Sequence, residues 1–191
     1  LKEDLKKIGK VHVVALNLTQ ISSHYAEFLA GVHIPKFDRK MGGGALMDMN
    51  IYNINFCVSL FGQPKQISYL QTIQRDTDTS GILNLTYDDK QASLIAAKDA
   101  VGPTRSYIEG EKGLIYFDGP LNVLPDYYVQ IEKEEPKHYN FNKYGHRMIS
   151  EFNYFAKKIK EHDQQAADEA YEHSLNAISV LEKAQEFLPH D

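Results

Sequence analysis

Asp48 and Tyr52 are the residues whose types and spacing best suit acid–base chemistry. They lie four positions apart in a segment that is predicted to be a helix over residues 45–61, so their side chains are neighbours on one face. A phenol beside a carboxylate can donate or accept a proton if both face a pocket. The alternative is a purely structural role, in which the Asp caps the first turn or interacts with the helix dipole and the Tyr only packs and hydrogen-bonds. Spacing alone favours this structural role.

The composition of the same helix indicates burial. At about 100° per residue, a polar stripe within roughly 60° contains Asp48, Tyr52, Asn55 and Ser59. Most of the remaining circumference is apolar, with Asn50 and Asn53 as the exceptions. A surface helix has a wide polar face, so these reversed proportions predict a helix that is buried on most sides. A carboxylate and a phenol on such a helix need partners or a cavity.

Other candidates for binding lie around this helix. Three glycines, 42–44, precede it and allow another backbone or a ligand to come close, which makes Gly43 and Gly44 candidates for the approach of a cofactor. Weaker candidates for substrate contacts are Asn17, His24, Arg39 and Asn55. Cys57 falls on the apolar side and is interpreted as core. No HxxH or HxxxH pairing occurs, so no metal site is predicted.

The elements that must position these residues predict an α+β fold. A helix over 1–8, a strand over 11–18 and a long loop over 19–43 precede the central helix; a loop of that length is usually functional. Short, partly alternating segments then predict a mostly antiparallel sheet, with strands at 66–75, 81–87, 91–98, 104–109, 113–118 and 127–132. Amphipathic helices at 145–161 and 166–187 finish the chain. We expect one domain over 1–191, with helices on one face of the sheet and the other face available to a second copy.

Composition bounds the class of protein. The 191 residues carry a formal net charge of −5, which argues against a non-specific nucleic-acid binder. No apolar run approaches the ~20 residues of a membrane span. A single cysteine excludes an internal disulfide framework and any CxxC motif. A cytoplasmic protein is therefore the default expectation.

The run from Gly42 to Pro64 resembles the signature of the glucose–fructose oxidoreductase, inositol dehydrogenase and rhizopine catabolism (Gfo/Idh/MocA) family. That pattern has a triple glycine, an Asp, a His or Tyr four residues later, and a G-x-P, matched here by Gly42 to Gly44, Asp48, Tyr52, Gly62 and Pro64. The G-x-x-G of residues 110–113 also fits. Asn50 departs from the pattern, because the family commonly has glycine there. The resemblance covers essentially the whole chain.

This resemblance implies the C-terminal substrate and dimerisation domain of a two-domain enzyme, which uses NAD or NADP and acts on a sugar, polyol or diol. Tyr52 would be the acid/base residue or would orient the reacting oxygen, and Asp48 would position Tyr52 and the substrate or relay the proton. The sequence contains no G-x-G-x-x-G and no E-K-P. The resemblance therefore assigns the Rossmann domain and the catalytic lysine to a segment that precedes Leu1. Alone, the chain is expected to bind no cofactor tightly and to turn over no substrate.

Two alternatives remain open at this point. One is a non-catalytic, sugar-sensing regulatory member of the same superfamily. The other is a stand-alone dimerisation or binding module. The presence of both Asp48 and Tyr52 favours the enzyme, because a pure sensor need not keep an acid/base pair.

Overall fold

The computed structural model describes residues 1–124, 126–141, 144–146 and 148–189. Within these residues eight strands form one sheet, in the order β2-β3-β4-β1-β5-β6-β7-β8. Their bounds are β1 (Val11–Thr19), β2 (Gln66–Gln74), β3 (Thr77–Thr86), β4 (Gln91–Ala97), β5 (Arg105–Gly110), β6 (Gly113–Asp118), β7 (Tyr127–Ile131) and β8 (Lys137–Tyr139). The predicted α+β fold with one large sheet is confirmed.

The sheet is antiparallel except at one pair. Strand β1 runs parallel to β4, with Leu16 opposite Leu94, and antiparallel to β5 on its other side. The first strand of the chain is thus inserted between two later hairpins, β3–β4 and β5–β6, in the middle of the sheet. Alternate side chains of the central strands, such as Leu16, Leu83 and Leu94, are fully buried. The expected "mostly antiparallel" sheet is therefore correct in pattern.

One strand prediction was wrong in extent, and one short strand was not predicted. β3 begins at Thr77 rather than at 81, because Arg75 and Asp76 alone form the turn, both with positive φ, and Thr77 already pairs with Gln74. A further strand, β8, follows the acidic stretch 132–135 and pairs with β7 at the edge of the sheet. In both places polar residues occupy strand positions that pairing with a neighbour, not composition, determines.

The long loop after β1 contains short helical segments that the sequence did not predict, because its apolar residues follow no regular spacing. It includes the short helix α2 (Tyr25–Leu29) and 3₁₀ turns at Pro35–Phe37 and Arg39–Met41. Phe28 and Phe37 stack within it, with ring centroids 4.3 Å apart, and both side chains are buried. The loop is therefore a packed segment.

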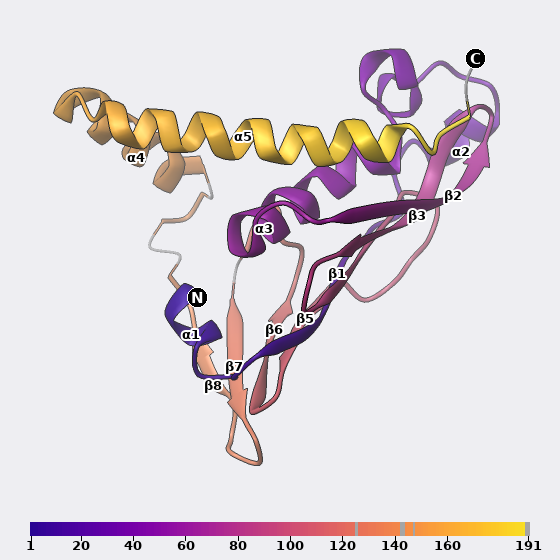
Figure 1. Ribbon diagram of the computed structural model, residues 1–191. Helices are drawn as coiled ribbons and strands as arrows, with labels where there is room; N and C mark the ends of the chain where they lie inside the picture. Colours follow the sequence, from indigo (N-terminus) through magenta and orange to yellow (C-terminus); the bar gives the residue numbers. More distant parts are fainter. Residues whose placement is uncertain (125, 142–143, 147, 190–191) are drawn as a thin grey trace.

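The helices that cover the sheet lie on one face (Figure 1). The predicted helix over 45–61 is present, but it opens with a π-helical turn at Leu46–Asn50 before α3 (Ile51–Phe61). α3 packs between the sheet and α5 (Gln164–Gln185), whose buried side chains include Val180 and Leu181. Burial on most sides is confirmed, since only Tyr52 and Ser59 of α3 are exposed.

Helix α4 (Met148–Glu161) lies beside the outer end of α5 (Figure 1). It was predicted over 145–161; position 147 lies outside the described residues. Its apolar face is exposed, with Phe152 at 66% and Ile159 at 69% relative accessibility. In the part of the chain that the structure describes, no helix combines the length and the apolar character that a bilayer crossing requires.

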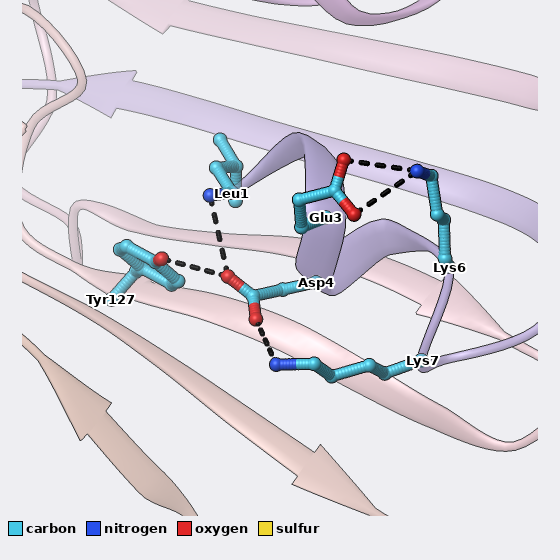
Figure 2. Close-up of polar contacts among 6 residues, drawn as sticks. All are labelled: Leu1, Glu3, Asp4, Lys6, Lys7 and Tyr127. Carbon is cyan, nitrogen blue, oxygen red and sulfur yellow. Dashed lines mark hydrogen bonds and ion pairs between the residues drawn. The ribbon is translucent and has the colours of Figure 1, made fainter.

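The N-terminal helix α1 (Lys2–Leu5) is shorter than the predicted 1–8 and is fixed by Asp4 (Figure 2). The Asp4 carboxylate accepts hydrogen bonds from the Tyr127 hydroxyl at 2.8 Å and from Lys7 Nζ at 2.6 Å, and the Leu1 nitrogen lies 3.2 Å away. Burial opposes ionisation of Asp4, but these partners outweigh it and hold its pKa below the ordinary value. The first helix is thereby tied to β7.

Candidate active site

The π-helical turn and the start of α3 position Asp48 and Tyr52. Gly42 and Gly44, with φ of 76° and 107°, redirect the chain into the turn. The buried carboxylate of Asp78 on β3 then accepts the backbone N–H of Leu46 over 2.7 Å. A carboxylate at this position satisfies an N–H that the first helical turn leaves without a helical partner. The element that carries both candidate residues is therefore held to the sheet at its first residue.

Asp48 forms an ion pair with a lysine that follows β4. Its Oδ2 atom accepts from Nζ of Lys98 over 2.6 Å; the Lys98 side chain is 3% exposed, whereas that of Asp48 is 38% exposed. Lys98 also donates to the Lys36 carbonyl, and its ammonium lies 4.7 Å from the centre of the Phe37 ring. These contacts account for a buried charge that would otherwise be unfavourable.

Tyr52 lines the same cavity as Asp48 and Lys98. The cavity has a volume of about 340 Å³ and is lined by Leu18, Gln20, Ile21, Ser22, Ser23, Lys36, Asp48, Met49, Tyr52, Lys98 and Asn122. Tyr52 is 41% exposed. The structure thus brings Asp48 and Tyr52 to one polar pocket, while the direct partner of Asp48 is Lys98.

The four weaker candidates lie outside that pocket lining. Asn17 donates to the Pro103 carbonyl and accepts from Thr19. The remaining three bind nearby atoms of this chain: His24 pairs with Glu27, Arg39 donates to the Pro189 carbonyl, and Asn55 donates to the Ile51 carbonyl in its own helix. Substrate contacts by these residues stay predictions.

Gly43 and Gly44 are packed against the chain itself. A Cβ atom on Gly43 would lie 2.6 Å from the backbone nitrogen of Asp38, and one on Gly44 would lie 2.1 Å from Oδ1 of Asp78. The close approach expected of these glycines is therefore made by the 3₁₀ segment and by β3. An approach of a cofactor to them remains a prediction.

Sequence reasoning missed Lys98. The available signal was its place directly after β4, where Ala92, Leu94 and Ala96 alternate as buried residues and Lys98 continues the alternation. A lysine at the buried end of such a series needs a carboxylate or carbonyl partner. Asn50 and Asn53 are also buried and bond to β4, since they donate to the Leu94 and Ile95 carbonyls.

A larger cavity, of about 470 Å³, lies beside the long loop and has different chemistry. Its lining is Phe28, Gly31, Val32, His33, Ile34, Phe37, Asp38, Arg39, Lys40, Arg75, Asp76 and Thr77. It contains neither Asp48 nor Tyr52, so size alone does not identify the site. Because a carboxylate, a phenol and a buried ammonium converge only in the smaller of these two cavities, we take the smaller one as the candidate active site.

The other buried titratable groups on this side of the sheet are structural. Burial raises the pKa of the Cys57 thiol to about 11, which keeps it neutral, as its interpretation as core requires. Burial also raises the pKa of Tyr69 and of Asp78, which share a hydrogen bond of 2.8 Å. Among the described residues, no group of three or more His, Cys, Asp or Glu side chains is arranged to hold a metal ion.

Comparison with known proteins identifies the family. The model of the GFO/IDH/MocA C-terminal domain matches residues 4–116, more than half of the chain. The chain therefore belongs to the Gfo/Idh/MocA C-terminal domain family, as the Gly42–Pro64 pattern indicated.

Two curated bacterial proteins are similar to this chain. One is the scyllo-inositol 2-dehydrogenase (NADP(+)) IolU of Bacillus subtilis (strain 168), 29% identical over 188 residues, which are 97% of this chain and 56% of that protein. The other is the uncharacterized oxidoreductase YgjR of Escherichia coli (strain K12), 27% identical over 168 residues, 85% of this chain and 49% of that protein. The chain thus spans about half the length of these relatives.

Solved structures share the fold. KijD10, a 3-ketoreductase from Actinomadura kijaniata in complex with NADP, aligns with a TM-score of 0.71 at 14% identity, over 97% of this chain and 55% of that one. The UDP-N-acetylglucosamine 3-dehydrogenase GnnA from Acidithiobacillus ferrooxidans aligns with a TM-score of 0.68 at 14% identity, over 97% and 57%. At these identities the likeness concerns the fold alone.

Proposed function

We propose that this chain is the substrate-binding domain, carrying catalytic residues, of an NAD- or NADP-dependent oxidoreductase that acts on a sugar, polyol or diol by hydride transfer. The observation that carries the proposal is the convergence of the Tyr52 phenol and the Asp48 carboxylate on one polar cavity, from one helix. Family membership supports it, as do the names of a scyllo-inositol dehydrogenase and a 3-ketoreductase among similar proteins.

The cavity suits the substrate better than a whole dinucleotide. Its volume of about 340 Å³ is at the small end of the about 300–1,000 Å³ of ligand pockets. Hydroxyl and amide groups from Ser22, Ser23 and Gln20 in the lining match a ligand with several hydroxyl groups. No Gly-rich turn between a strand and a helix is available here for a pyrophosphate. Phosphate binding by the cofactor would therefore fall to residues outside this chain.

The two catalytic candidates would divide the work as follows. When bound, a nicotinamide cofactor supplies the hydride acceptor or donor. Tyr52 in its deprotonated, phenolate form would take the proton from the reacting substrate hydroxyl during oxidation, and as the neutral phenol it would give a proton to the carbonyl oxygen during reduction. Asp48 would accept a hydrogen bond from the substrate and so fix the reacting carbon near Tyr52.

The experiment that tests this proposal uses the intact protein of which the chain is part. NADP(H) and NAD(H) absorbance at 340 nm is followed with a panel of polyols, sugars and diols that includes scyllo-inositol. We expect activity with at least one of them, and a loss of about 10²–10⁴-fold in kcat for Tyr52→Phe. Absence of activity across the panel, with ligand binding preserved, would favour the sugar-sensing regulatory alternative.

We further propose that the open face of the sheet joins two copies of the protein. Leu70 (66% exposed), Val13 (44%) and Ile82 (40%) lie on this face, and a stacked row crosses it in which the ring centroids of Tyr116 and Tyr128 are 4.8 Å apart. A sheet with helices on one side must cover or solvate its other side. In sedimentation velocity we expect the wild-type protein to be a dimer. Ile82→Asp should convert it to a monomer, whereas Ile159→Asp on α4 should leave it dimeric. A monomeric wild type would exclude the proposal.

A further inference from the structure

Lys98 is a buried lysine to which the proposed reaction gives no role. The whole residue is 2% exposed, and its ammonium contacts Oδ2 of Asp48 at 2.6 Å, the carbonyl of Lys36 and the face of Phe37. Holding an ammonium out of water is unfavourable unless each proton finds an acceptor. The two oxygens and the ring therefore fix where the charge lies, and it lies at the wall of the candidate active site.

The contacts of Lys98 join separate parts of that wall. Lys36 belongs to the long loop after β1, whereas Asp48 belongs to the π-helical turn. The backbone carbonyl of Lys98 also accepts the N–H of Ser22, over 2.8 Å, at the start of the same loop. Lys98 thus contacts the loop at two points and the turn that carries Asp48 at a third.

We propose that Lys98 is a positioning residue of this site, which holds Asp48 as a fixed acceptor and keeps the Lys36 segment of the loop against it. The proposal rests on the proposed function for the role of Asp48. It also favours one of the two roles left open for that carboxylate, because an acceptor already paired with an ammonium is better suited to hold a substrate than to carry a proton. Oδ1 of Asp48 has no partner among the described residues and is available for that purpose.

Three variants separate positioning from a merely structural effect. Lys98→Met removes the charge and keeps much of the length, and Lys98→Arg keeps the charge. Lys90→Met is the matched control: the Lys90 side chain is only 16% exposed, pairs with Asp89 and lies 5.4 Å from the centre of the Phe61 ring, outside the pocket lining. A structural role would lower the stability of Lys98→Met without changing the kinetics of the folded fraction.

The first measurement needs no substrate and uses the 191-residue chain labelled with ¹⁵N-lysine. A buried, hydrogen-bonded ammonium should give a slowly exchanging NMR signal that disappears in Lys98→Met. The signal should shift or broaden in Asp48→Asn and stay in place in Lys90→Met. Absence of such a signal, or a signal that Asp48→Asn leaves unchanged, would overturn the proposal.

The second measurement uses the intact protein and the panel substrate with the highest rate. We expect Lys98→Met to lower kcat/KM for that substrate by about 100-fold, to leave the KM for the cofactor within about twofold, and to be partly rescued in Lys98→Arg. Wild-type kcat/KM in folded Lys98→Met would overturn the proposal, and a loss equal to that of Lys90→Met would do the same. If no panel substrate reacts, the proposed function fails on its own and the ammonium signal decides the position of Lys98.

Discussion

Asp78 accepts the backbone N–H of Leu46 over 2.7 Å, so the turn that carries Asp48 begins on a carboxylate buried in the neighbouring strand. The same Oδ2 atom accepts from the Tyr69 hydroxyl at 2.8 Å. Burial raises the pKa of Asp78, and the hydrogen bonds from Leu46 and Tyr69 oppose that rise without cancelling it. The start of the helix that carries Asp48 and Tyr52 is therefore sensitive to the charge on the Asp78 side chain.

The pH dependence of stability should show this sensitivity. Because the pKa of Asp78 in the folded state lies above its ordinary value of 3.8, the folded protein binds more protons than the unfolded protein between the two values. This group's contribution to the free energy of unfolding therefore falls as pH rises through that window and then levels off. Asp78→Asn keeps an acceptor oxygen for Leu46 and removes the titration.

Urea unfolding of both proteins at several values from about pH 4 to 7 checks this. Subtracting the Asp78→Asn values from the wild-type values removes the contributions of all other carboxyl groups, including Asp4, whose lowered pKa acts in the opposite direction. The difference should decrease as pH rises. A difference that stays constant or increases with pH would show that the Asp78 pKa is not raised.

A pair of alanine substitutions tests the packing of the glycines before the helix. In Gly44→Ala the new Cβ would lie 2.1 Å from Oδ1 of Asp78, at a φ of +107°, whereas in Gly42→Ala nothing lies within 4 Å. We expect Gly42→Ala to lose about 1–2 kcal/mol of unfolding free energy from backbone strain alone, and Gly44→Ala to lose about 1–3 kcal/mol more from overlap. Equal losses, measured from urea midpoints, would mean that the turn relaxes away from Asp78.

Cofactor binding by this chain alone should be weak. The sequence lacks a dinucleotide-binding turn, and its closely packed glycines approach Asp38 and Asp78. Isothermal calorimetry of the 191-residue chain with NADPH and with NADH should therefore give no micromolar affinity. A micromolar dissociation constant for either nucleotide would place a cofactor site within this chain. It would contradict the proposal that residues outside this chain bind the cofactor phosphates.

Much of the fold could be predicted because its signals are local. The alternating residues of β4, the glycines before the central helix and Gly62 after it locate elements without knowledge of their neighbours. The helix that carries Asp48 and Tyr52, and its burial, follow from the same kind of pattern. The pairing of β1 between β4 and β5 does not, because registers between distant strands leave no periodic trace in one sequence.

The parts of the site that were missed depend on tertiary contacts. Lys98 finds Asp48 and Lys36 only because β4 ends beside the π-helical turn, 50 residues away along the chain from Asp48. Asn50 and Asn53 interrupt an apolar face in the sequence. Both are nevertheless fully buried, because their side-chain amides donate to the Leu94 and Ile95 carbonyls of β4. Polar residues on an otherwise apolar surface were thus the available signals for hidden partners.

We expect the cavity beside Asp48 and Tyr52, and not the larger one beside Arg75, to bind a polyol. The most direct test is a titration of the ¹⁵N-labelled chain with scyllo-inositol, followed by backbone NMR signals. Binding with a dissociation constant of about 1–10 mM should move the signals of Ser22, Asp48 and Tyr52, and Tyr52→Phe should keep the fold while weakening the shifts. Shifts centred on His33 and Arg75, or no shifts at all, would show that the cavity beside Asp48 and Tyr52 does not bind the polyol.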